Sequence, residues 1–313
     1  MNRTRRSDGQ EPEMLSDRIS SWRKLVERCG RKASKKRVHA LRVATLRIQA
    51  EVEDELHDLP RASHEAQAMV RFGRLAEKLR EALGAVRELD VWIGKLQGLQ
   101  NSLREGMTYV PRSSRETGRQ LGQLEQRLTK KRERSSAKLT AQIVKRQDDL
   151  LQAAQGLEAS TRDRIDAEED RAPKLLTEFA AIVTDFPAFD EGNLHEFRKR
   201  LKKIRYLAEI HQADSRCQRI AEQMKKAQGS IGEWHDWQVL ARTAEHGKHA
   251  KDVEAVELLN SLTGEAYQTA IATCDSVVRR ITEMQQNELE SHIIRKPPAH
   301  SENAGSVAEG KLA

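Results

Sequence analysis

The segment VHALRVATLRIQ at residues 38–49 decides the fold, because a second version of it, LHEFRKRLKKIR, occupies residues 194–205. Each version carries a histidine at its second position and an arginine three residues later. A further matching pair lies downstream, LGAVRELDVW at residues 83–92 and IGEWHDWQVL at residues 231–240. Both pairs keep the same order at similar offsets, 156 residues between the histidines and 148 between the glycines. This pattern predicts an internal duplication of two units of roughly 140 residues each.

Helices are the secondary structure that the composition favours. Of the 313 residues, 33% are charged and only 4% are aromatic, and the chain holds 17 glycines and 7 prolines. Such a composition is typical of long amphipathic helices, and no stretch alternates apolar and polar residues for long enough to predict a strand. β-Sandwiches, β-barrels and Gly-rich nucleotide-binding folds are therefore disfavoured.

The helical pattern predicts an all-α fold of two four-helix bundles with long helices. Gly30 is expected to end the first helix, and Ser34 to cap the second. The eight helices are expected at about residues 15–29, 35–58, 61–100, 113–155, 174–185, 193–213, 214–246 and 250–288. The predicted organisation is a disordered N-terminus (1–13), a first four-helix half (14–156), an acidic linker (157–173), a second four-helix half (174–288) and a disordered tail (289–313).

The sequence gives no sign of a membrane segment or of a metal site. No apolar run is long enough to span a bilayer, and the basic start lacks the apolar stretch of a secretory signal. The cysteines, Cys29, Cys217 and Cys274, have no metal-ligand spacing and fit a reducing compartment. We therefore expect a cytoplasmic protein with no membrane contact, no metal and no cofactor.

The strongest charge signal lies in the second repeat segment. Residues 197–208 contain six cations and no acid, whereas a solvated helix usually interleaves Glu and Lys at a spacing of four. Arg198 and Lys202 are a like-charged pair at that spacing, which costs roughly 0.2–0.5 kcal/mol, and His195 shares their face. An anionic ligand explains such a face better than solubility does.

Two further stripes are weaker. The segment 28–50 contains eight cations and no acid, and its Lys35, His39 and Arg42 share one helix face. A third stripe has acids nearby, so a solvated face explains it equally well; its members are Arg127, Lys131, Arg134, Lys138 and Lys145.

The histidines of the two repeat segments are expected to respond to this charge. Neighbouring cations disfavour imidazolium, so the pKa of His39 and of His195 should fall, and a bound polyanion would reverse the shift. His235, beside Asp236, is expected either to be structural or to line the same site.

Four segments together resemble the CHAD family, named for a conserved histidine α-helical domain. Residues 38–48 look like the family's first His-x-x-Arg helix, and residues 83–92 look like its Leu-Gly-x-x-Arg-Asp-x-Asp-Val segment. Residues 194–207 and 224–240 are similar to the corresponding segments of its second half. Each motif alone is weak, but the four in order are fairly specific, and the helices that carry them span about residues 15–287.

The resemblance implies two bundles related by a pseudo-twofold axis, a channel or cleft lined by basic side chains, and association with inorganic polyphosphate. Leu46 and Gln49 stand where the family's first-half motif usually carries Arg, which implies a weaker first half. No catalytic residue is implied. The candidate polyphosphate-binding residues are Lys35, His39, Arg42, Arg47, Lys78, Arg87, Arg134, His195, Arg198, Lys199, Lys202, Lys203, Arg205, Lys225, Lys226 and His235.

Three other interpretations stay open. A pI near 9.3 permits nucleic-acid binding, but the strongest stripes hold few aromatic residues on which bases could stack. A polyphosphate-processing enzyme would need a phosphate loop or metal-binding carboxylates, and neither is evident. A purely structural scaffold predicts no anion preference beyond bulk charge. We therefore expect a non-enzymatic polyphosphate-binding protein, with polyphosphate granules and their associated proteins as candidate location and partners.

Overall fold

The computed structural model describes residues 14–57, 59–106, 114–161, 170–246 and 253–295. These residues form eight helices and no strand, which confirms the predicted all-α fold. The helices are α1 (Leu15–Arg31), α2 (Lys35–Glu55), α3 (His64–Arg104), α4 (Ser114–Thr161), α5 (Arg171–Thr184), α6 (Leu194–Ile210), α7 (Ser215–Glu245) and α8 (Val253–Arg295).

The boundary between α1 and α2 follows local chemistry only in part. Ser34 caps α2 as predicted, since its Oγ accepts a hydrogen bond from the amide of Arg37 at 3.4 Å. Gly30 does not end α1, which runs on to Arg31. Its role is close packing: a Cβ at this position would lie 3.1 Å from Cγ2 of Ile143 in α4.

Two helices extend well past their expected C-terminal ends. α4 continues to Thr161 and α8 to Arg295, so both enter segments that were expected to be linker or tail. α5 begins at Arg171 and holds Pro173 in its first turn, where a missing amide proton does no harm. The disorder expected for residues 1–13 and 296–313, and the linker core at 162–169, lie outside the described residues.

The first half is built around a core shared by α1, α2, α3 and α4. Trp22 is fully buried and meets Phe72 edge to face, with ring centroids 5.3 Å apart. The indole nitrogen of Trp22 donates to Oγ1 of Thr45 at 2.9 Å, so its one polar group is satisfied. Leu41 and Ile143 join the same core.

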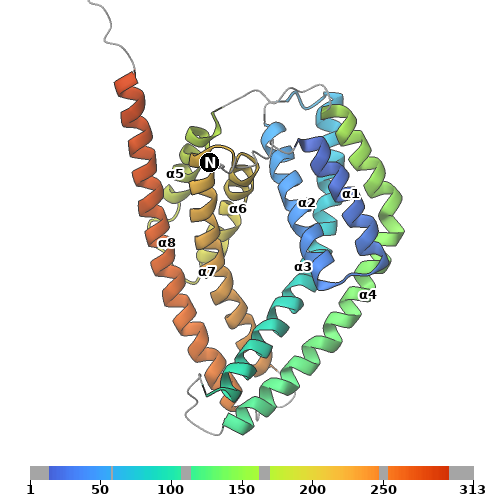
Figure 1. The fold of residues 1–313 in the computed structure, drawn as a ribbon, viewed down its shortest axis with the longest axis vertical. Coiled ribbons are helices and arrows are strands. Elements are labelled where there is room, and N and C mark those ends of the chain that lie inside the picture. Colours follow the sequence, from blue (N-terminus) through green and yellow to red (C-terminus); the bar gives the residue numbers. More distant parts are fainter. Residues whose placement is uncertain (1–13, 58, 107–113, 162–169, 247–252, 296–313) are drawn as a thin grey trace, which may run out of the picture.

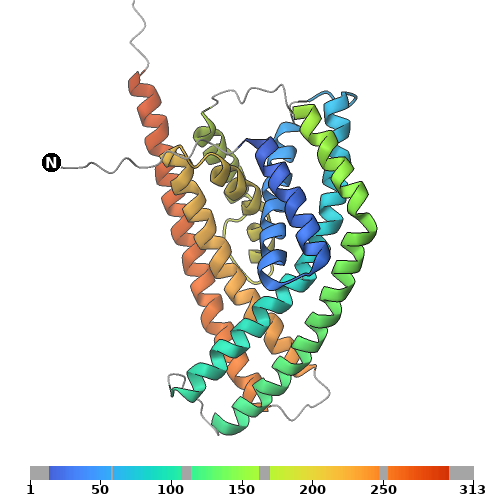
Figure 2. The ribbon, with the colours of Figure 1, turned by 45° about the vertical axis from the view of Figure 1, so that its right-hand side comes forward.

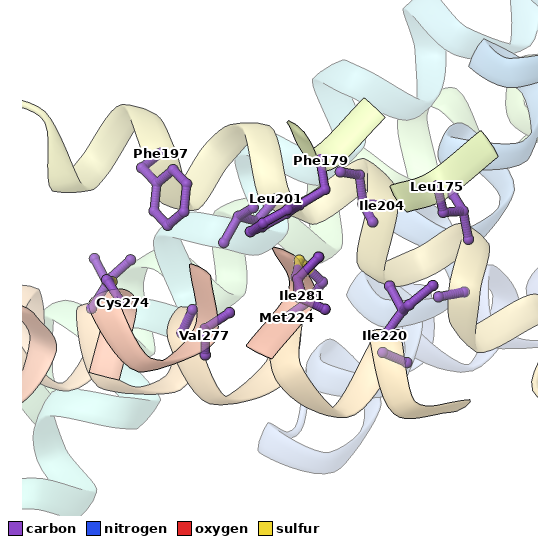
Figure 3. Close-up of a cluster of buried hydrophobic side chains, with 14 of the residues drawn as sticks. Leu175, Phe179, Phe197, Leu201, Ile204, Ile220, Met224, Cys274, Val277 and Ile281 are labelled. Carbon is purple, nitrogen blue, oxygen red and sulfur yellow. The ribbon is translucent and has the colours of Figure 1, made fainter. Parts of the chain in front are cut away.

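The second half has its own core between α5, α6, α7 and α8. Figure 3 shows Phe179, Phe197, Met224 and Cys274, one from each of these helices, among the side chains that meet there. Ala50 of α2 also belongs to this core. The core of the second half is therefore covered in part by α2, a helix of the first half.

A third core joins the two halves at the end where α3 and α4 meet α7 and α8. It combines Leu96 of α3 and Leu121 of α4 with Leu240 of α7 and Leu259 of α8. Figures 1 and 2 show the two sets of helices side by side, with the lower parts of α3 and α4 meeting α7 and α8. The packing is compatible with two four-helix bundles, but the long helices also form this shared four-helix joint.

Candidate functional site

In each half, the arginine of the first repeat motif (Arg42 or Arg198) lies against the glycine of the second motif (Gly84 or Gly232). A Cβ built at Gly84 would lie 3.6 Å from a terminal nitrogen of Arg42, and one at Gly232 would lie 3.3 Å from a terminal nitrogen of Arg198. Each guanidinium also donates to the backbone carbonyl four residues before that glycine, at 3.3 Å from Arg42 and 3.2 Å from Arg198. The two halves therefore fix their arginines by the same contact.

Lys202 of α6 lies at the centre of a group of guanidiniums. Burial and, after it, the charges of four nearby arginines from both halves together lower the pKa of its ammonium to about 8. Among the described residues, no carboxylate forms an ion pair with Lys202. We call this group the cationic cluster; its members are Arg42, Arg80, Arg198, Lys202 and Arg205.

The cluster is partly shielded from water. Arg42, Arg198 and Lys202 are each half-buried, and burial is the largest cause of the lowered pKa of both arginines. Tyr206 and Glu88 oppose that shift at both arginines. Half-buried guanidiniums held against backbone carbonyls keep most of their donors available, because each has five N–H groups.

The two repeat histidines flank the cluster. Burial and then the charges of Arg87 and Arg42 lower the pKa of His39. In the second half His235 takes the place of Arg87, and its ring centroid lies 5.4 Å from that of His195. Burial, then His235, then neighbouring cations lower the pKa of His195. The predicted direction is confirmed, although burial comes before the cations as its cause.

Glu209 of α6 neutralises two predicted ligand residues. Arg47, reaching across from α2, lies 3.1 Å from Oε2 of Glu209, and Arg205 lies 3.0 Å from Oε1. Arg205 also donates to the side-chain oxygen of Gln228 at 2.7 Å. Arg47 thus helps to hold the two halves together, whereas both contacts of Arg205 lie within the second half.

Asp54 of α2 makes the reciprocal contact. This buried carboxylate accepts from Arg171 at 2.7 Å and lies 3.5 Å from Lys174 and 3.7 Å from Lys203. All three cations belong to the second half. Residues 197–208 contain no acid of their own, but Asp54 of α2 lies near one of their cations, Lys203.

The remaining predicted residues lie outside the cluster. The Lys35 ammonium lies close to Gly94 of α3, 3.6 Å from the Cβ that an alanine would carry there, and Lys199 pairs with Glu196 at 2.5 Å. Lys78 lines a separate groove between α3 and α4. Three more are exposed and form no ion pair within the described part of the chain: Arg134, Lys225 and Lys226.

The structure adds Arg80 and Glu209 to the site. Arg80 precedes Gly84 by four residues, one helical turn, so the spacing on α3 could have placed it beside Arg42. Glu209 gives no such signal, because its partner Arg47 is 162 residues away.

The acids of the second pair of motifs bridge helices. Asp90 accepts from Arg132 of α4 at 3.0 Å, and Asp236 of α7 accepts from the indole of Trp92 in α3 at 3.2 Å. Within the described ranges, no three His, Cys, Asp or Glu side chains gather as metal ligands, and no helix is long and apolar enough to cross a bilayer.

Substitution of each glycine by alanine tests the two arginine contacts. Alanine favours a helix over glycine by up to about 1 kcal/mol, so Gly84→Ala should raise Tm and leave Arg42 in place. Gly232→Ala should move Arg198, because its new methyl would be too close, and should therefore raise Tm less than Gly84→Ala does. Thermal unfolding of both variants measures this; an equal rise in Tm would contradict the difference between the two distances.

Comparison with known proteins agrees with this geometry. No curated protein and no solved structure matches the chain. The family model described as CHAD domain matches residues 13–245, which include both arginine–glycine contacts and end where α7 ends. Because this match covers well over half of the 313 residues, the chain belongs to the CHAD family.

Proposed function

We propose that this protein binds inorganic polyphosphate at the cationic cluster and does not process it chemically. The observation that carries the proposal is Lys202, a half-buried ammonium surrounded by four arginines and without a carboxylate partner among the described residues. Such a cation is costly in the free protein. A bound anion would offset that cost.

The chemistry of a phosphate chain suits this cluster. Polyphosphate presents a linear series of anionic oxygens and has no base or apolar face. Arg42 and Arg198 can each bridge two oxygens with a planar guanidinium, while Lys202 supplies a point charge between them. His39 and His195 lie beside the cluster and can gain a proton when a polyanion is bound.

The rival functions need features that the cluster does not offer. Of the aromatic residues in the second-half stripe, Phe197 is buried in the core and Tyr206 is also buried, so neither offers an open face for a base. Phosphoryl transfer would need carboxylates that hold Mg²⁺ beside the phosphate. We expect the protein to be cytoplasmic, at polyphosphate granules.

A titration with long-chain polyphosphate at two salt concentrations tests the proposal. Single-stranded DNA of matched charge runs in parallel, and orthophosphate release is measured in the presence of Mg²⁺. We expect tighter binding of polyphosphate than of DNA at both salt concentrations, with an affinity that falls as salt rises, and no phosphate release. Equal binding of both polymers that is lost at moderate salt would overturn the proposal, and release of phosphate would replace binding with turnover.

The affinity should depend on pH in the alkaline range. Lys202 has a pKa of about 8 in the free protein, and a bound phosphate should return it towards its ordinary value. Binding then favours the protonated form, so affinity is full below pH 8 and falls as pH rises; it should be about tenfold weaker at pH 9 than at pH 7. Titrations at both values measure this, and Lys202→Met should lose most of the difference, since only protonation of His39 and His195 on binding remains.

A further inference from the structure

A pocket of about 420 Å³ opens beside the cationic cluster, between α2, α3 and α6. It shares Lys202 and Arg80 with the cluster, and Tyr206 also lines it. Its volume falls in the range of small-molecule sites. The pocket is therefore a candidate for a ligand other than an extended chain.

The two walls of this pocket differ in character. The wall from the first half carries apolar side chains that remain open to solvent, the half-buried Leu46 and Val70, which leaves 40% of its surface exposed. The opposite wall, from α6, is cationic. A bare phosphate chain would leave the apolar wall wet, whereas a ligand with an apolar body would cover it.

Free cations mark where an anionic group would lie. Among the lining cations of the pocket, Arg80 pairs with Glu77 at 3.5 Å and Lys203 with Asp54 at 3.7 Å. Lys202 and Arg74 form no ion pair within the described residues. A phosphoryl group between these two side chains would give both a partner.

Hydrogen-bond acceptors mark the other end of the ligand. Gln49 is 9% exposed and lines the pocket, and its side-chain oxygen has no hydrogen-bond partner. A buried acceptor without a partner is costly. The carboxylate of Glu53 lines the same wall. The side-chain oxygens of Gln49 and Glu53 would each accept a hydrogen bond from a ligand that carries N–H or O–H donors.

We propose that this pocket binds an organic phosphate, in which a phosphoryl group is attached to an apolar body that bears N–H or O–H donors. The phosphoryl group lies between Lys202 and Arg74, the body covers Leu46 and Val70, and a donor reaches Gln49. This goes beyond polyphosphate binding, and because Lys202 is shared, the two ligands compete.

The probes that test the pocket are ATP and inorganic triphosphate, two ligands of similar charge. In calorimetric titrations of the full chain without Mg²⁺, a generic basic surface gives both the same affinity. The pocket predicts that ATP binds at least about tenfold more tightly, because only ATP has an apolar body to bury against Leu46 and Val70.

Two variants assign the preference to the pocket. Leu46→Arg places a charge on the apolar wall and should bring the ratio of the two affinities to about one, while Gln49→Leu should weaken ATP binding several-fold and leave triphosphate unchanged. Circular dichroism verifies that both are folded. A wild-type ratio of one, or an unchanged ratio in both folded variants, overturns the inference.

The outcome is separable from that of the proposed function. Long-chain polyphosphate is titrated into the same wild-type sample. Polyphosphate binding with no ATP preference defeats only the organic-phosphate pocket, whereas an ATP preference without polyphosphate binding defeats only the proposed function. Displacement of ATP by polyphosphate supports the shared use of Lys202.

Discussion

Replacing Lys202 with methionine is expected to raise Tm and to weaken polyphosphate binding in the same variant. Methionine fills a similar volume but removes a half-buried charge that is surrounded by four arginines. Relief of that repulsion should stabilise the fold by about 1 kcal/mol, or roughly 2–4 °C in Tm. The affinity should fall at least about tenfold, since one charge-assisted hydrogen bond is lost.

Lys203→Met is the matched control, because it removes an identical charge from the next position. Lys203 faces the buried carboxylate of Asp54 at 3.7 Å, and the loss of one of the three cations around Asp54 should lower Tm slightly. A rise in Tm for Lys203→Met, or a fall for Lys202→Met without loss of affinity, would contradict the assignment of Lys202 to a ligand site.

The triple variant Arg42→Ala, Arg198→Ala, Lys202→Ala should have the largest effect on binding. It removes one guanidinium from each half and the ammonium between them, so affinity for long-chain polyphosphate should fall by at least a factor of about a hundred. The slope of log affinity against log salt should also decrease by about two to three units, because fewer counterions are released. Arg205 is left intact, because its contacts with Glu209 and Gln228 make its loss ambiguous.

A second triple variant holds the net charge equal. Arg219→Ala, Arg279→Ala, Arg280→Ala removes three exposed cations from α7 and α8. If binding depends on the cluster, this variant should lose only a few-fold in affinity and keep its salt slope nearly unchanged. Equal losses in both variants would mean that bulk charge, and not the cluster, attracts the polyanion.

The positions of the helices were predictable because helical periodicity and capping are local. The expected start of α2 after Ser34 was confirmed, and the expected and observed starts of α1 both fall at Leu15. The predicted ends of α4 and α8 were wrong, because the last turns of both helices lie in sequence that resembles a linker or a tail. At the end of α4 the buried Leu157 packs against the first-half core, and such packing is not visible in local composition.

Part of the site was predictable for the same reason. Spacing alone placed His195, Arg198 and Lys202 on one face of α6, and the pKa of His195 shifts in the expected direction. Contacts between distant segments were harder to predict: nothing in the local pattern indicates that Glu209 would pair with Arg47, 162 residues away.

The sequence by itself determined the helices, their charged faces and the paired motifs, since each depends on residues within a few turns of one another. Only the tertiary structure decided which of the cations remain free. Glu209 pairs with Arg47, and Asp54 lies near Lys203, across distances in sequence that no periodicity encodes. Lys202 forms no ion pair among the described residues, while four arginines of α2, α3 and α6 lie near enough to lower its pKa, because the effect of a charge depends on what lies near it in space.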